Sequence, residues 1–219
     1  MYASISADIV SSTSHSERSM IALNERIREG LYIIEQNYSG FWGRIVRGDT
    51  IECILDHPED AFEVAIILKS WIKSFSPIGY GDYSRFRKYG IRLAIGVGEM
   101  NIINRRLDLM DGEAIYRSGR TLDKLVGRSK YSMVISMENK DVEEPLNIIL
   151  SLINNLLNNA TSRRCLTLCE RLLSSSSIET ADKMNITTSG VNQSLNEIGW
   201  SSIEQAISYY RKTILHYVI

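Results

Sequence analysis

The chain has 219 residues, of which 44% are hydrophobic, and its formal net charge is −1 at pH 7. This length suits one large domain or two modest ones, and the near-neutral charge excludes a general electrostatic attraction to nucleic acid. The three cysteines are too few for a disulfide framework. No signal peptide is visible, and apolar runs such as Val64–Leu68 stop at Lys69, so we expect a soluble cytoplasmic protein.

Hydrophobic spacing predicts an α+β arrangement over the first part of the chain, because runs of period two indicate strands and spacings of three and four indicate helices. In chain order we expect a buried strand at 2–10, a helix through Met20–Ile34, a hairpin of 41–46 and 50–55, a helix from Pro58 to about Phe75, a loop at 76–90, a strand at 91–97, a helix at about 113–125 and a strand at 131–136. In the 91–97 strand, apolar residues alternate with small or polar ones, which indicates one open face.

The composition changes after residue 136. The segment 137–145 is polar and acidic and ends in proline, which is typical of a linker. The rest of the chain has helical spacing, with helices expected at 147–159, 163–173, 178–184, 188–198 and about 202–218. We therefore predict an α+β domain at 1–138 and a small all-α domain at 146–219.

Two aspartates are the first candidates for a functional site. Asp8 lies at the end of the first predicted strand, and Asp49 follows Gly48 in the hairpin turn. If these strands are neighbours in one sheet, the two carboxylates meet at one of its ends and suit a divalent metal that carries a phosphate. Each aspartate alone also fits a plain cap or turn role. The segment Ser11–Ser14, which enters a predicted helix, would offer backbone N–H groups to phosphate at the start of that helix.

The element order, with Gly-Asp in the hairpin, resembles the catalytic domain of class III nucleotidyl cyclases. Four segments carry the resemblance, namely Ser6–Ser12, Arg47–Asp49, Ile91–Gly98 and Gly112–Arg120. The resemblance implies a ferredoxin-like fold and a Mg²⁺ or Mn²⁺ ion held by Asp8, Ile9 and Asp49. It also implies a transition-state arginine at Arg120, which in the cyclases acts across a homodimer.

Two positions depart from the cyclase pattern. Tyr116 stands where the family usually has a transition-state asparagine, and Ile45 lies near the position of the base-recognising lysine. These departures favour binding without turnover, or another nucleotide chemistry. The basic residues Arg117, Arg120, Lys124 and Arg128 share one helix face, which suits polyphosphate or nucleic acid but equally a solvated surface. The predicted ligand-binding residues are Ser11, Ser12, Tyr116, Arg117 and Lys124.

A second resemblance covers the whole chain. The Arg47–Asp49 turn, the run Asp111–Arg120 and the C-terminal helices together resemble the SatD family of bacterial proteins, which are regarded as transcriptional regulators. Within those helices, the segment Ile178–Leu195 resembles a helix-turn-helix, with Ala181 at the helix crossing. Outward polar side chains on such a unit can bond phosphates or base edges. The predicted DNA-binding residues are Thr187, Thr188, Ser189, Asn192 and Gln193.

The candidate recognition helix has no lysine or arginine between Thr187 and Ile198. Neutralisation of a DNA backbone would therefore depend on Arg163, Arg164, Lys183, Arg211 or Lys212. A helical dimerisation module is the alternative for this region. For the whole chain we expect a DNA-binding regulator whose cyclase-like domain binds a nucleotide or phosphate ligand. A metal-dependent cyclase or related phosphotransfer enzyme is the alternative, and a scaffold with two relic sites is the third reading.

Overall fold

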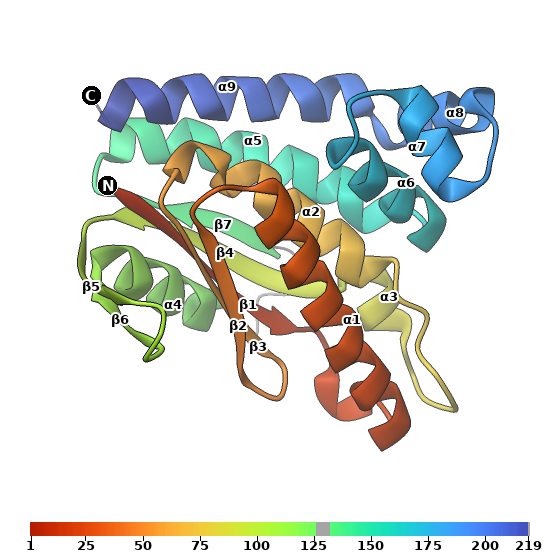
Figure 1. Ribbon diagram of the computed structural model, residues 1–219, viewed down its shortest axis with the longest axis horizontal. Coiled ribbons are helices and arrows are strands. Elements are labelled where there is room, and N and C mark those ends of the chain that lie inside the picture. The colour runs from red at the N-terminus through yellow and green to blue at the C-terminus, as the bar shows by residue number, and fades with distance from the viewer. Residues whose placement is uncertain (126–131, 219) are drawn as a thin grey trace.

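The computed structural model describes residues 1–125 and 132–218. Its centre is a five-stranded sheet of order β2-β3-β1-β4-β7 (Figure 1). The strands are β1 (Tyr2–Ile9), β2 (Phe41–Arg47), β3 (Thr50–Leu55), β4 (Ile91–Gly98) and β7 (Met133–Ser136). All neighbouring pairs are antiparallel except β4 and β7. Because Asp8 of β1 lies opposite Thr50 of β3, the end of β1 and the hairpin turn share one end of the sheet.

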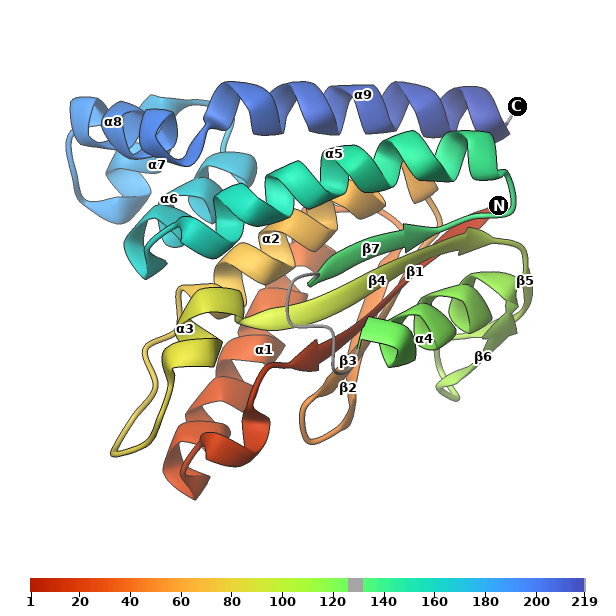
Figure 2. The same ribbon diagram turned by 180° about the vertical axis from the view of Figure 1, so that it is seen from behind.

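Helices cover both faces of the sheet. One face packs on α1 (Glu17–Asn37) and on α2 (Ala61–Lys73), which follows a single turn, η2 (Pro58–Asp60). The other face carries α4 (Glu113–Leu125) (Figure 2). A Cβ at Gly96 of β4 would lie 2.2 Å from the carbonyl oxygen of Ala114. The open face predicted for the 91–97 strand is therefore wrong, because its small residues let α4 pack closely against it.

Two elements lie where the sequence suggested loops. The segment 76–90 contains α3 (Ser84–Tyr89), which is anchored by the fully buried Phe86. The polar stretch before α4 forms a hairpin of β5 (Met100–Asn104) and β6 (Leu109–Gly112). In that hairpin Arg105 donates to Asp56 at 2.6 Å and to the carbonyl of Gly40 at 3.0 Å. Both elements depend on tertiary contacts, and neither has a strong local pattern in the sequence that would have predicted it.

The C-terminal part is helical, as predicted. Its helices are α5 (Lys140–Asn159), α6 (Ser162–Leu172), α7 (Ser177–Met184), α8 (Thr188–Ile198) and α9 (Trp200–Val218). The linker predicted at 137–145 is wrong, because α5 begins at Lys140 and includes Pro145. Proline removes one helical hydrogen bond, but the buried Leu146 and Leu150 that follow hold α5 on the core.

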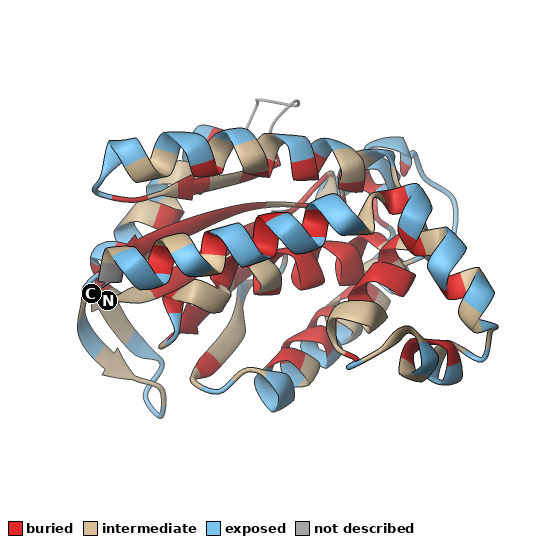
Figure 3. Ribbon diagram, turned by 90° about the horizontal axis from the view of Figure 1, so that it is seen from above, coloured by how far each residue is buried: buried red, intermediate tan, exposed pale blue. Residues whose placement is uncertain are grey.

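The α+β region and the C-terminal helices share one hydrophobic core. Lys73 of α2 is 1% exposed and donates to the carbonyls of Leu157, Asn158 and Ala160, at 2.7, 3.1 and 2.6 Å, which closes the end of α5. On α9 buried and exposed residues alternate around the helix (Figure 3), and its buried Tyr210 donates to the carbonyl of Pro58 at 3.0 Å. Among the described helices, none is both long and apolar enough to cross a membrane.

Candidate functional site

Asp8 and Arg92 form an ion pair at the end of β1. They are register partners on β1 and β4, so both side chains point to the face of the sheet that carries α4. A guanidinium nitrogen of Arg92, Nη2, donates to Oδ2 of Asp8 at 2.8 Å. The two side chains are only 18% and 20% exposed, so the pair is poorly screened by solvent.

Asp49 lies beside this pair. The backbone N–H of Ile9 donates to the carbonyl of Asp49 at 3.2 Å, which ties the hairpin turn to the end of β1. The pKa of Asp8 is raised, chiefly by burial, and the charge of Asp49 raises it further while Arg92 lowers it. The two aspartates are thus close enough to interact electrostatically.

A hollow of about 320 Å³ opens at this end of the sheet. Its lining residues are Asp8, Ile9, Ser11, Ser12, Thr13, Arg85 and Arg92. Asp8, Ile9, Ser11 and Ser12 are residues that the sequence had marked for metal or ligand. Arg85 and Arg92 were missed, and they bring two cations to a site that had been expected to hold a metal cation.

The segment after β1 differs from the predicted helix start. Ser11 adopts a left-handed conformation (φ 57°), and Ser12–Ser14 form a single 3-10 turn. The N–H groups of Ser14 and His15 donate to the carbonyls of Ser11 and Ser12, and α1 begins only at Glu17. The expectation that 11–14 presents a helix start to phosphate is therefore wrong, and the segment contributes hydroxyls to the hollow.

At the end of β1, Asp8 is already paired with Arg92, and this guanidinium competes with a divalent metal for the carboxylate. An ion bound to Asp8 would lie within about 2.0–2.6 Å of a carboxylate oxygen, and hence close to the guanidinium that already binds Asp8. Arg92 already supplies the positive charge that a metal would bring.

The predicted residues on α4 lie apart from this hollow. The Tyr116 hydroxyl donates to Asp111, and Arg117 forms an ion pair with Glu113 one turn before it. Arg120 is exposed, with its guanidinium 5.8 Å from the centroid of the Tyr116 ring. Lys124 lines a separate hollow of about 250 Å³ between α4, β7 and α5. Arg128 lies outside the described residues, and the role of Arg120 across a homodimer stays a prediction.

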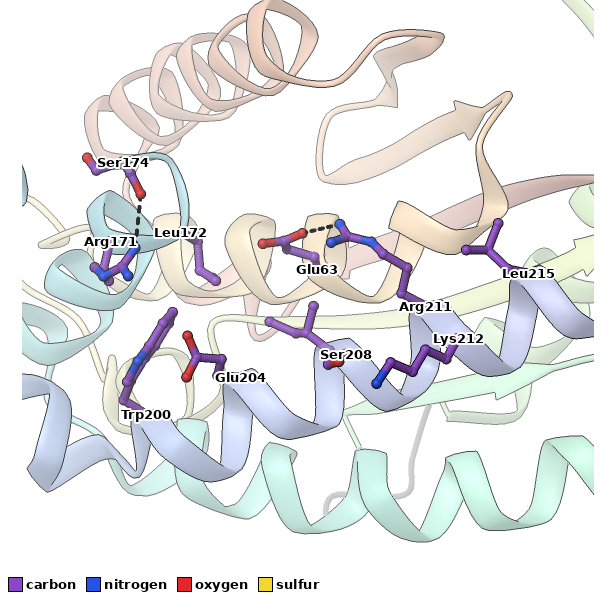
Figure 4. A pocket seen from close by; sticks show the side chains of 11 residues that line it. Glu63, Arg171, Leu172, Ser174, Trp200, Glu204, Ser208, Arg211, Lys212 and Leu215 are labelled. Carbon is purple, nitrogen blue, oxygen red and sulfur yellow. Dashed lines mark hydrogen bonds and ion pairs between the residues drawn. The ribbon is translucent and has the colours of Figure 1, made fainter. Parts of the chain in front are cut away.

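A second and larger hollow, of about 420 Å³, lies between α2, α6 and α9 (Figure 4). Two of its arginines already have partners. Arg211 donates to Asp60 at 2.8 Å and to Glu63 at 2.7 Å, and Arg171 donates to the carbonyl of Ser174 at 2.9 Å. The Arg171 guanidinium also lies 4.8 Å from the centroid of the Trp200 ring. This hollow resembles a packing seam more than a ligand site.

The predicted DNA-binding residues surround the start of α8. The Thr187 hydroxyl caps this helix by accepting from the N–H of Gly190 at 3.1 Å, so it serves the fold. Thr188 is half-buried, whereas Ser189, Asn192 and Gln193 are exposed, and Gln193 donates to Glu197 at 3.3 Å. Of the basic residues expected to neutralise DNA, three form ion pairs, namely Arg164 with Glu197, Lys183 with Glu179, and Arg211 with Asp60 and Glu63. These partners weaken the positive potential around α8.

No protein-family model matches this chain, and no characterised protein matches it in sequence. Two solved structures, both of a bacterial light-regulated adenylyl cyclase, resemble it in fold over 62% of its length. The first has 15% identity, a TM-score of 0.43 and 74% of its own chain covered. The second has 18% identity, a TM-score of 0.40 and 42% covered. The similarity to these two structures is distant, and the chain itself has an α+β region followed by a helical region. SatD membership stays a prediction.

Proposed function

We propose that this chain is a DNA-binding regulator whose α+β region binds a phosphate-bearing ligand, such as a nucleotide, without turning it over. The observation that carries the ligand half of the proposal is the hollow at the end of β1. There Arg92 holds Asp8, and Arg85, Ile9 and three hydroxyl residues complete the lining. Arginines are favoured for phosphate because their planar N–H groups match its oxygens.

Three features favour binding over nucleotidyl transfer. Metal-dependent transfer uses the ion to polarise the phosphoryl group, and Asp8 is engaged with Arg92 instead. Tyr116 is bonded to Asp111 and cannot act as the missing asparagine amide. Arg120 is not among the lining residues of the hollow within one chain.

The DNA half of the proposal depends on α7 and α8. A three-residue connection, Asn185–Thr187, joins these helices, and the buried Ala181, Val191 and Leu195 pack them together. This packing leaves Ser189, Asn192 and Gln193 exposed at the start of α8. Because nearby cations are paired with acids, we expect weak, salt-dependent affinity with base preference set by these polar side chains.

Incubation with nucleoside triphosphates tests the first half. The protein is mixed with each triphosphate and Mg²⁺ or Mn²⁺, products are followed by chromatography, and binding is followed by calorimetry. We expect saturable binding of at least one nucleotide and no conversion. Conversion of a triphosphate to a cyclic or otherwise transferred product would overturn the proposal in favour of the metal-dependent enzyme.

Gel-shift assays on fragments of the coding gene's upstream region, at stated salt, test the second half. Asn192→Ala with Gln193→Ala should relax sequence preference, since one bidentate base contact is worth about 1–3 kcal/mol. Gln205→Ala, an exposed residue on α9, is the matched control and should leave the shift unchanged. Absence of any shift across genomic fragments would exclude DNA binding and leave α7 and α8 as a helical interaction module.

A further inference from the structure

We infer that Arg92 and Arg85 form a phosphate subsite that works without a metal, and that Asp8 positions Arg92 instead of binding an ion. This inference rests on the proposed binding of a phosphate-bearing ligand and specifies where and how the phosphate is held. It departs from the metal that the cyclase resemblance implies, and it gives a role to the two arginines that the resemblance did not mark.

Arg92 is the fixed part of the subsite. It lies within β4, directly opposite Asp8 in the register, and its side chain is 18% exposed. Among the residues that the structure describes, its buried Nε atom has no hydrogen-bond partner. Within residues 1–125 and 132–218, three other arginines also have a buried Nε without a partner, but Arg92 is the one among them that lines this hollow. A guanidinium has five N–H donors, so the bond to Asp8 leaves donors for a second anion.

Arg85 is the adaptable part. It is exposed and reaches the hollow from α3, and within the described residues its side chain has no ion pair or hydrogen bond. The helix that carries it is held in place by Phe86, whose ring packs edge-on against His15 at 4.7 Å and Phe75 at 6.2 Å between centroids. Arg85 can therefore close over a ligand from a backbone that stays in place.

The lining of the hollow offers an anion both arginines and hydroxyl groups. Two arginines face one lining carboxylate, Asp8, and Ser11, Ser12 and Thr13 add hydroxyl donors. The lining residues alone carry one net positive charge, and Asp49, beside Asp8 but outside the lining, offsets part of it. A volume of about 320 Å³ is at the small end of ligand sites, so it suits a phosphoryl group with an adjoining sugar better than a whole dinucleotide.

The role assigned to Asp8 gives opposite expectations for one substitution. In a metal site, Asp8→Asn removes a metal ligand and weakens nucleotide binding. In the arginine subsite, asparagine still accepts a hydrogen bond from Arg92 while a negative charge beside the phosphate disappears. Binding of a phosphorylated ligand to Asp8→Asn should then be unchanged or tighter.

The experiment measures affinity for ATP and for inorganic pyrophosphate by calorimetry, in Mg²⁺ and in EDTA. We expect equal affinity in both buffers, and a loss of about tenfold to a hundredfold in Arg85→Ala, since a bond to a charged group is lost. Arg87→Ala, an exposed arginine on the same helix but outside the hollow, is the matched control and should change affinity little. Asp8→Asn should bind at least as tightly as the parent.

The outcomes separate this inference from the proposed function. Binding that needs Mg²⁺ and disappears in Asp8→Asn restores the metal site and overturns the inference. If affinity depends neither on Mg²⁺ nor on Arg85, the ligand binds elsewhere on the protein. The inference then fails, while the proposed binding of a phosphate-bearing ligand stands. If neither ATP nor pyrophosphate binds the parent protein, both fail together. Because Arg85 is exposed, its loss should not unfold the chain, and a thermal melt of each variant checks this.

Discussion

Two of the hollows, between α2 and α9 and at the end of β1, differ in how their arginines are paired. In the hollow between α2 and α9, Arg211 meets two carboxylates, Asp60 and Glu63, at 2.8 and 2.7 Å. At the end of β1, Arg92 meets one carboxylate while Arg85, beside it, has no described partner. A polar network with every member satisfied holds a fold together, whereas donors left without partners are available to a ligand. Arg211 is therefore occupied by the fold, whereas the arginines at the end of β1 keep donors for a ligand, which makes the smaller hollow the candidate site.

The largest effect is expected where α2 joins the end of α5. Lys73→Met should leave three carbonyls without their donor, and we expect a loss of about 2–4 kcal/mol in the free energy of unfolding. Urea denaturation measures it, with the exposed Lys88→Met as the matched control. Ligand affinity in the absence of urea should not change. A change would mean that the contact between α2 and the end of α5 is coupled to the hollow at the end of β1.

The second prediction concerns Lys69, a buried residue on α2 one helical turn before Lys73. Its ammonium donates to the carbonyls of Tyr89 and Ile91 and to the Ser132 hydroxyl, at 2.7, 3.2 and 2.8 Å. Burial, with the nearby charge of Lys73, lowers the pKa of Lys69 from 10.5 to about 7. Between these values the unfolded state binds more protons than the folded state, so stability rises as pH rises.

From pH 7 to pH 9 this contribution should reach roughly 2 kcal/mol, at about 1.4 kcal/mol per unit of pKa shift. Denaturant titrations across that range measure it in the parent protein and in Lys69→Met. The variant should lose the rise with pH, whatever its absolute stability. An identical slope in both proteins would mean that Lys69 is not the titrating group.

The third prediction addresses the α2–α9 contact itself. Arg211→Ala leaves the partly buried Glu63 without its cation, and burial already raises the pKa of that carboxyl. Because Arg211 is 42% exposed, solvent moderates the loss, and we expect about 1–2 kcal/mol. Lys212→Ala, its exposed neighbour, should cost less than about 0.5 kcal/mol. A drop in nucleotide affinity with Arg211→Ala would instead make the larger hollow the binding site.

Local sequence patterns were sufficient to predict most helices and strands and part of the candidate site. Hydrophobic spacing located the long helices and the hairpin, and the neighbouring strands β1 and β3 do bring Asp49 to the end of β1. Arg92 could not be found in this way, since it is 84 residues from Asp8 and their pairing depends on the register of two strands. Arg85 lies on α3, within a segment whose Gly, Tyr and Ser content indicated a loop.

Tertiary packing also overrode local signals elsewhere. Lys69 ends an apolar run in the sequence, yet it is fully buried because three acceptors surround its ammonium. Pro145 marked a linker, yet it lies within α5 because the leucines after it belong to the core. Sequence patterns report what a segment prefers alone, and these residues depend on partners far along the chain.

The most direct test of the account is a titration of Mn²⁺ in the absence of nucleotide, followed by electron paramagnetic resonance, in the parent protein and in Asp8→Asn. If Arg92 takes the place of the metal, both proteins should leave the signal of aqueous Mn²⁺ equally undiminished. If the parent instead binds one ion and Asp8→Asn loses it, Asp8 is a metal ligand and the central claim is wrong.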